Sequence, residues 1–166
     1  MNRDKEIQRL AWPDSPLALR ERLYKIGVPK IILKTADETM TSDDTLTNDA
    51  ELLLAIGANE VWLFRFLLRL ISHTTPDIQF DLALPSGATG RGILYDYKTA
   101  PGNWRLIPGT PLSVPTDSTE TFLEIVITIV NSTIAGDVAL KWAQDTSDAN
   151  ATTIYKNSCL IATRLK

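Results

Sequence analysis

From residue 30 onward, hydrophobic and polar residues alternate with a period of two, which is typical of β-strands. In the clearest example, residues 61–72, large hydrophobic side chains occupy every second position and are predicted to face a core: Trp62, Phe64, Phe66, Leu68 and Leu70. The opposite face mixes aliphatic side chains with two arginines: Val61, Leu63, Arg65, Leu67, Arg69 and Ile71. For this mixed face we expect either a contact between subunits or cover by the N-terminal segment or a second sheet.

Further strands are predicted at short intervals along the chain. They comprise residues 30–35, 52–56, 78–84, 92–98, 104–107, 121–131, 138–143 and 152–164. Turn-forming residues separate them, for example Gly57–Asn59 and Pro85–Gly87. This pattern predicts an all-β fold, an antiparallel β-sandwich with a jelly roll as the leading topology. The predicted core includes Trp62, Phe64, Phe66, Leu68, Phe80, Leu82, Ile125, Ile127, Leu140 and Trp142.

The first 34 residues do not share this alternation and are interpreted as an extended attachment arm (1–34) ahead of the sandwich domain (35–166). One short helix is predicted at about residues 16–26. A capping serine, a proline at the first helical position and a closing glycine and proline mark its ends: Ser15, Pro16, Gly27 and Pro29. Leu19, Leu23 and Ile26 form an apolar stripe on it. Because so short a helix is marginal alone, it needs a surface to lie on.

Charge is divided between the same two parts. Residues 1–34 carry eight Lys/Arg and four Asp/Glu, a net of +4, whereas residues 35–166 carry nine and sixteen, a net of −7. The net charge of −3 for the whole chain predicts no general attraction to nucleic acid. Trp12, in an extended stretch before the helix, either anchors the arm to a partner or folds back on its own domain. The predicted arm contacts are Trp12, Leu19, Leu23, Tyr24 and Ile26.

The sequence shows no signature of a catalytic, cofactor-binding or metal site. The single histidine, His73, is predicted in an exposed turn, without the partners that a metal would need. The acidic pairs at residues 43–44 and 145–148 lack the spacing of a calcium loop and are interpreted as turn residues. The glycine-rich segment 87–92 resembles a phosphate-binding loop, but a strand is predicted after it instead of a helix.

Two further observations bear on the compartment. The N-terminus lacks the apolar stretch of a signal peptide, and the most apolar segment, 61–71, is too short to span a bilayer. We therefore expect synthesis in a cytoplasm and no membrane contact. The single cysteine, Cys159, excludes a disulfide within the chain and is predicted to be a small buried residue.

Several strand-and-turn motifs lie along residues 35–166. They are Thr35–Thr39 (TADET), Thr45–Asp49 (TLTND), Ala58–Phe64 (ANEVWLF), Thr75–Ile78 (TPDI), Pro85–Gly90 (PSGATG) and Trp142–Asp148 (WAQDTSD). Together they resemble a family of small virion structural proteins of tailed bacteriophages. The resemblance spans most of this region and leaves out the arm.

The resemblance implies a non-enzymatic virion structural protein. We expect a capsid decoration (cement) protein on the capsid surface, a homotrimer whose arm contacts the major capsid protein or another virion structural protein. Its expected self-association face is the mixed face of the long strand: Leu63, Arg65, Leu67, Arg69 and Ile71. We expect neither nucleic acid nor a cofactor as a partner.

Two alternatives remain open from the sequence. One is a tail or head fibre module, attached by the arm, whose sandwich binds a receptor or glycan. Its candidate ligand-facing aromatics are Tyr95, Tyr97 and Trp104, which could stack on a sugar. The other is a phage-encoded enzyme such as a glycosidase, for which the sequence offers only unpaired loop carboxylates.

Overall fold

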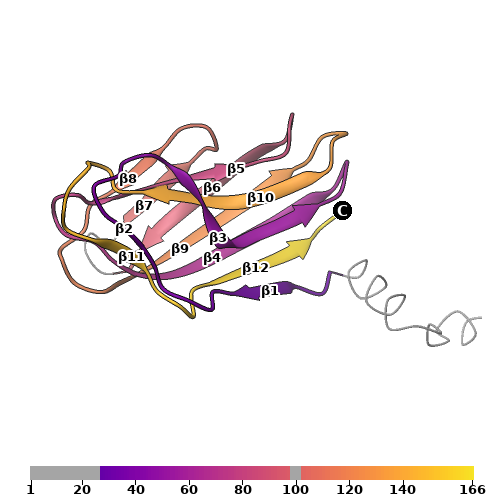
Figure 1. Ribbon diagram of the computed structural model, residues 1–166. Helices are drawn as coiled ribbons and strands as arrows, with labels where there is room; N and C mark the ends of the chain where they lie inside the picture. Colours follow the sequence, from indigo (N-terminus) through magenta and orange to yellow (C-terminus); the bar gives the residue numbers. More distant parts are fainter. Residues whose placement is uncertain (1–26, 98–101) are drawn as a thin grey trace, which may run out of the picture.

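The computed structural model describes residues 27–97 and 102–166. This part of the chain contains twelve β-strands and no helix (Figure 1). The strands are β1 (Lys30–Leu33), β2 (Glu38–Met40), β3 (Thr47–Ile56), β4 (Val61–Ile71), β5 (Ile78–Ala83), β6 (Thr89–Asp96), β7 (Gly102–Leu106), β8 (Leu112–Val114), β9 (Thr121–Val130), β10 (Gly136–Ala143), β11 (Thr152–Ile154) and β12 (Cys159–Arg164). The predicted helix at residues 16–26 and the predicted arm contacts Trp12, Leu19, Leu23, Tyr24 and Ile26 lie outside the described residues.

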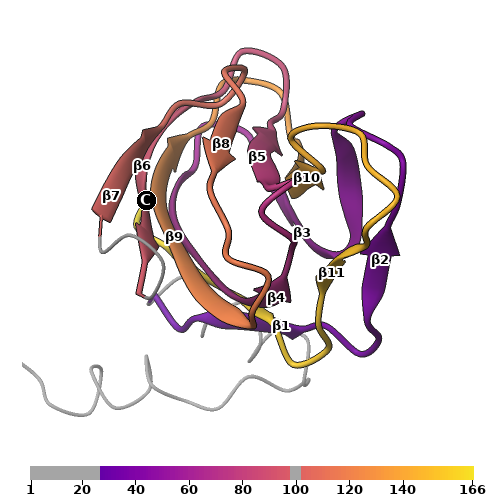
Figure 2. The same ribbon diagram turned by 90° about the vertical axis from the view of Figure 1, so that its left-hand side faces the viewer.

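Two antiparallel sheets pack face to face. The large sheet has the order β1-β12-β4-β9-β6-β7, and β11 extends it by pairing with β2 and with the end of β4. The small sheet has the order β3-β10-β5-β8. Figure 2 looks roughly along the strands and shows the two sheets on opposite sides of the interior. The predicted antiparallel sandwich is therefore confirmed for the described residues.

The eight consecutive strands β3–β10 have the connectivity of a jelly roll. They stand in the order β3-β10-β5-β8 in the small sheet and β4-β9-β6-β7 in the large sheet. Every connection between consecutive strands crosses from one sheet to the other, except the β6–β7 hairpin. This arrangement of two Greek keys agrees with the predicted topology. Strands β12 and β1 widen the large sheet beyond β4.

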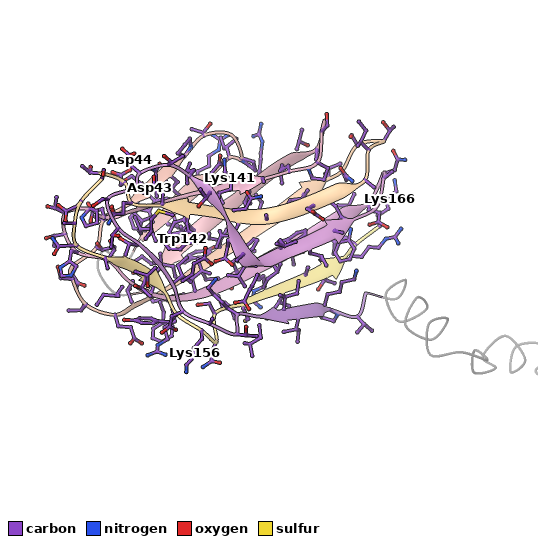
Figure 3. The ribbon with its side chains drawn as sticks, in the orientation of Figure 1. Asp43, Asp44, Lys141, Trp142, Lys156 and Lys166 are labelled. Atoms are coloured by element: carbon purple, nitrogen blue, oxygen red, sulfur yellow. The ribbon has the colours of Figure 1, made fainter. Side chains whose placement is uncertain are left out.

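The core lies between the two sheets and is built from the inward-facing residues of both. All ten residues predicted for the core are buried, including Phe64 on β4 and Trp142 on β10. Figure 3 shows Trp142 among the side chains between the sheets. The prediction succeeded because β4, β9 and β10 bury one complete face each, so the alternation in the sequence maps directly onto burial.

Some strand boundaries differ from the prediction. The segment 152–164 forms two strands, because the chain turns at Asn157, where φ is +69°. Strands β2 and β8 were not predicted, since each has only three residues and shows too little alternation. Residues 30–34, which the sequence analysis grouped with the arm, belong to the sandwich, because β1 pairs with β12.

A buried ion cluster ties the end of β1 to the small sheet. The side chains of Lys34 and Asp49 are 1% and 0% exposed, and the Lys34 Nζ lies 2.9 Å from Asp49 Oδ2 and 2.5 Å from Glu38 Oε2. Asp49 Oδ1 also accepts hydrogen bonds from the backbone N–H groups of Glu51 and Leu52. These bonds hold an irregularity in β3, where the pairing with β10 shifts register. The cluster therefore has a structural role.

Candidate functional site

The strand register places an apolar surface on the large sheet, on the side away from the small sheet. Directly opposed residues in antiparallel strands point to the same side, so the pairing defines rows across the sheet. One row is Leu33, Cys159, Leu67, Glu124 and Tyr95. The next row is Ile31, Ile161, Arg65, Val126 and Ile93. We call this surface, from β1 across β12, β4 and β9 to β6, the outer face.

The outer face carries most of the exposed hydrophobic surface in the described residues. In the described residues, nine large hydrophobic side chains are exposed to solvent. Five of them belong to strands of the outer face: Ile31, Leu33, Ile93, Phe122 and Val130. A sixth, Tyr97, follows β6 and approaches Glu124 of β9. Six of the nine exposed large hydrophobic side chains in the described residues therefore lie on or beside the outer face, where they are interspersed with charged residues.

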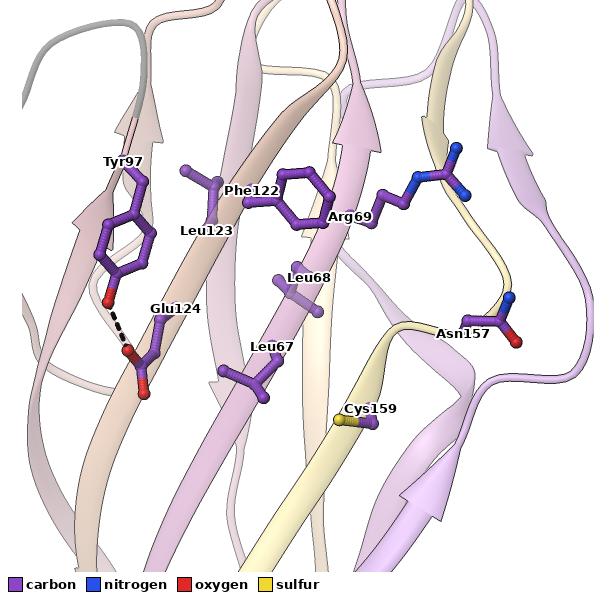
Figure 4. Close-up of a pocket in the computed structure, with 9 residues that line it drawn as sticks. All are labelled: Leu67, Leu68, Arg69, Tyr97, Phe122, Leu123, Glu124, Asn157 and Cys159. Atoms are coloured by element: carbon purple, nitrogen blue, oxygen red, sulfur yellow. Dashed lines mark hydrogen bonds between the residues drawn. The ribbon is translucent and has the colours of Figure 1, made fainter.

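A groove lies within the outer face, between β12, β4, β9 and the end of β6. It has a volume of about 480 Å³ and is lined by Leu67, Leu68, Arg69, Tyr97, Phe122, Leu123, Glu124, Asn157 and Cys159 (Figure 4). We call it the outer groove. Its size is in the range that accommodates a large side chain or a small ligand.

Glu124 forms the polar side of the outer groove. Its Oε2 accepts a hydrogen bond of 2.6 Å from the Tyr97 hydroxyl, and its Oε1 accepts one of 2.8 Å from Arg65 Nε (Figure 4 shows the first). The Tyr97 hydrogen bond and the Arg65 guanidinium hold the pKa of Glu124 below its ordinary value. The same hydrogen bond raises the pKa of Tyr97. Glu124 is therefore held as a carboxylate at neutral pH.

Two arginines of the outer face, both on β4, are engaged by carboxylates, and a third, Arg91 on β6, is exposed. Arg65 pairs with Glu124, and Arg69 forms a two-point contact with Glu120. The Arg69 guanidinium also lies 4.8 Å from the ring centroid of Tyr155. With their charges paired, these arginines suit a protein contact better than a phosphate-rich ligand.

Cys159 is half-buried and lines the outer groove, which corrects the prediction that it is fully buried. It faces outward because it begins β12 opposite Leu67, in the outer-face register. Burial raises the pKa of its thiol, so the thiolate is a small fraction at neutral pH. The residue is therefore accessible from the outer groove.

The predicted self-association residues lie together on the outer face. Leu63, Arg65, Leu67, Arg69 and Ile71 alternate with the buried residues of β4, and the small sheet packs on the other side of the strand. One predicted alternative, cover of this face by a second sheet, is therefore wrong. Sequence reasoning missed the residues that β1, β9 and β6 add, among them Leu33 and Phe122, because their position beside β4 depends on long-range pairing.

The three candidate ligand-facing aromatics do not share one surface. Tyr95 and Tyr97 lie on the outer side of the large sheet, where Tyr97 contacts Glu124. Trp104 pairs with the buried Leu94 and packs against the core. Of the three candidates, only Tyr97 lines the outer groove.

The loop residues considered for chemistry have structural roles. Asp43 and Asp148 each accept a hydrogen bond from a backbone N–H two residues ahead, as turn residues do (Figure 3 shows Asp43). His73 is half-buried, not exposed as predicted, and its backbone carbonyl accepts the hydroxyl of Thr116. Within residues 27–97 and 102–166, no group of three or more His, Cys, Asp or Glu side chains is placed to hold a metal ion.

The glycine-rich segment 87–92 serves a turn and a close strand contact. Gly87 has a φ of +75° in the turn before β6, and a strand follows it, as predicted. A Cβ at Gly92 would lie 2.5 Å from the Val126 carbonyl oxygen, so only glycine fits between β6 and β9 there. These glycines are explained by packing alone.

No family model matches the sequence, and no curated protein is significantly similar to it. Among solved structures, infectious bursal disease virus strain Gx is similar at 11% identity over 82% of this chain, with a TM-score of 0.19. The VP2 subviral particle of infectious bursal disease virus is similar at 11% identity over 83%, with a TM-score of 0.20. This chain covers 39% and 42% of those chains, respectively. Scores this low support no conclusion about fold or function.

In the part of the chain that the structure describes, no helix is suited to span a bilayer.

Proposed function

We propose that this protein is a non-enzymatic structural protein of a bacteriophage virion, whose subunits contact one another through the outer face. The observation that carries this proposal is the gathering of exposed hydrophobic residues on one side of the large sheet. Exposed hydrophobic residues that gather on one face are a feature of interaction sites in proteins. The predicted self-association residues of β4 lie in the middle of this surface.

The composition of the outer face supports a protein partner. Aromatic and aliphatic side chains surround two arginines that are already paired with carboxylates. Interfaces between proteins are enriched in aromatic residues and arginine, and a groove beside an aromatic residue can accept an anchoring side chain. The outer groove next to Phe122 offers such a place.

Within the virion, we assign the protein to the capsid surface as a decoration (cement) protein. The sandwich would form a homotrimer, and the arm would contact the major capsid protein or another virion structural protein. The motif resemblance along residues 35–166 and the basic arm ahead of an acidic domain support this assignment. An arm that becomes ordered on the lattice can contact a wide surface and link neighbouring subunits.

Copy number in purified virions tests this assignment. A decoration protein should be present in amounts comparable with the major capsid protein, measured by quantitative band intensities. A small number of copies per particle would favour the alternative, a tail or head fibre module with a receptor- or glycan-binding sandwich. Absence of the protein from purified particles would contradict both.

A further inference from the structure

The outer face raises the question of what covers it in a free subunit. A surface reserved for contacts in an assembly is exposed to water until assembly, and such a surface promotes premature association. The side chains of Ile31 and Leu33 on β1 are 69% and 53% exposed in the described residues. The segment that precedes them is the nearest part of the chain by sequence.

The chain enters the sandwich at the edge of the outer face. Gly27 lies beside the end of β12, where a Cβ would be 3.8 Å from the Arg164 carbonyl oxygen and 4.0 Å from Thr163 Cγ2. Its φ of +80° belongs to the left-handed region, which suits a change of chain direction. Residues 1–26 are therefore tethered to the same sheet that carries the outer face.

The sequence of this segment complements the outer face. Leu19, Leu23 and Ile26 would form an apolar stripe on the helix predicted from the sequence, and Trp12 lies earlier in the chain. Residues 1–26 carry six Lys/Arg and four Asp/Glu, a net of +2, whereas residues 27–166 carry eleven and sixteen, a net of −5. The outer face itself carries Arg65, Arg69 and Arg91 beside Glu120 and Glu124, so charge does not select the segment, and apolar burial is the term that favours contact between the two.

The length of the segment is sufficient to reach the outer groove. Cys159 in the groove lies four residues along β12 from Thr163, a distance of roughly 13 Å. Residues 16–26 span roughly 16 Å as a helix, and residues 12–15 add roughly 13 Å when extended. The apolar stripe can thus cover the residues of β1 and β12 while Trp12 reaches the groove.

The tether also favours the segment over a second copy. A site and a ligand joined by a short linker meet at an effective concentration in the millimolar range. A second subunit competes at that level only when subunits are concentrated, as on a capsid lattice. In the free protein, contact of the outer face with the segment of the same subunit is therefore favoured over contact with a second subunit.

We propose that in the free subunit residues 12–26 lie on the outer face of their own subunit, with the apolar stripe over β1 and β12 and Trp12 at the outer groove. The inference rests on the proposed function, because it concerns the regulation of the same surface. Binding of the arm to the particle would uncover the outer face and permit contact between subunits only on the lattice.

The single cysteine of the chain reports on this contact. Cys159 is the only thiol and lines the outer groove, so its rate of modification by dithiobis(nitrobenzoate) measures access to the groove. The full chain is compared with the variant Trp12→Ser/Leu19→Ser/Leu23→Ser. The control Glu21→Ser/Lys25→Ser changes the opposite side of the predicted helix and leaves the net charge unchanged.

We expect the stripe variant to react about tenfold faster or more, because cover of the groove is lost, and the control to react like the wild type. Rates in denaturant give the reference for the uncovered thiol. In the wild type, the rate should not depend on protein concentration, since the cover is intramolecular. Equal rates in all three proteins, or protection that grows with concentration, would overturn the inference.

Sedimentation of the same proteins separates this inference from the proposed function. If the stripe variant exposes Cys159 at a dilution where it is monomeric and associates at higher concentration, cover by the segment and contact through the outer face are both supported. If it exposes Cys159 but stays monomeric at every concentration, the cover stands and the subunit contact is contradicted. If it associates as the wild type does, with an unchanged Cys159 rate, the contact stands and the cover is contradicted.

Discussion

At the residue scale, substitutions on the two faces of β4 and β9 should differ in how much they lower the free energy of unfolding. Phe64 is fully buried between the sheets, whereas Phe122 is 56% exposed on the outer face. Replacing Phe64 with Ala should lower the free energy of unfolding by about 3–5 kcal/mol, because it leaves a cavity in the core. Phe122→Ala is the matched control and should cost under about 1 kcal/mol. Chemical denaturation measures both, and equal losses would show that the faces are assigned wrongly.

The Tyr97–Glu124 contact predicts a dependence of stability on pH. The pKa of Glu124 is lower in the folded protein than its ordinary value of 4.5, mainly because Tyr97 donates a hydrogen bond to it. The unfolded chain therefore binds more protons in acid, and this part of the stability is present above the ordinary pKa and is lost as pH falls through the folded pKa.

Tyr97→Phe removes the largest cause of that pKa shift. Between about pH 6 and about pH 3, the variant should lose less unfolding free energy than the wild type. Asp43 and Glu51, whose pKa values are also lowered by hydrogen bonds, titrate in both proteins, so the difference between the two isolates Glu124. Denaturation at a series of pH values measures it. Parallel curves would contradict the assigned role of Tyr97.

The sequence predicted burial well and side-chain partners poorly. Alternation identified Phe64 and Trp142 as core, because each strand buries one face. It could not identify the pairing of Glu124 with Arg65 and Tyr97, which joins residues far apart in the sequence. The sequence also predicted a buried Cys159, because its pattern indicates one strand over segment 152–164. The division of this segment into β11 and β12 sets the register that turns Cys159 outward.

At the scale of elements, the junction between β1 and the small sheet depends on the buried pair of Lys34 and Asp49. Burial alone would lower the pKa of Lys34, but the hydrogen bonds to Glu38 and Asp49 outweigh it and raise the pKa. The ammonium is therefore charged at neutral pH. It compensates the carboxylate that holds the irregular part of β3.

Replacing Lys34 with Met should lower the free energy of unfolding by about 3–5 kcal/mol, because Asp49 is left as an uncompensated buried charge. The control Lys156→Met changes an exposed lysine near Asp37 and should stay within about 0.5 kcal/mol of the wild type. Thermal and chemical denaturation measure both. A small loss for Lys34→Met would show that water or a local rearrangement compensates Asp49.

Element boundaries were harder to predict than element types. Residues 30–33 resemble a strand by alternation, but only pairing with β12 shows that they belong to the sandwich and not to the arm. The first half of β3 was not predicted, because residues 47–49 are all polar and show no alternation. Asp49 is tolerated within the strand because its side chain accepts hydrogen bonds from backbone N–H groups. The first error arises from pairing over a long sequence distance, and the second from local hydrogen bonds that periodicity does not reveal.

At the scale of the whole molecule, the account separates an arm from a folded sandwich. Within the described residues, both sheets and the core between them are complete, so we expect the sandwich to stay folded when residues 1–26 are deleted. Under the proposed function, the truncated protein should no longer co-sediment with undecorated capsids, whereas the full chain should. If charge contributes, binding of the full chain weakens as salt rises. Undiminished co-sedimentation of the truncated protein would place attachment on the sandwich.

The sequence predicted the fold class and the mixed face of β4, but not the extent of the outer face. That extent follows from the jelly-roll order, which places β9 and β6 on one side of β4 and β12 and β1 on the other. Strand order depends on pairing between distant segments, which periodicity does not encode. The exposed Ile31, Leu33 and Phe122 are therefore seen to lie on the same face only in the structure.

The central claim, that the outer face is a contact between subunits, is tested most directly by sedimentation equilibrium of residues 27–166, which lack the proposed cover. This protein should associate reversibly, and Phe122→Glu should be a folded monomer, because a charge then lies in the contact. Thr133→Glu, an exposed change in the β9–β10 turn, should associate like the unchanged sequence. A monomer at every concentration for residues 27–166, or unchanged association of Phe122→Glu, would contradict the claim.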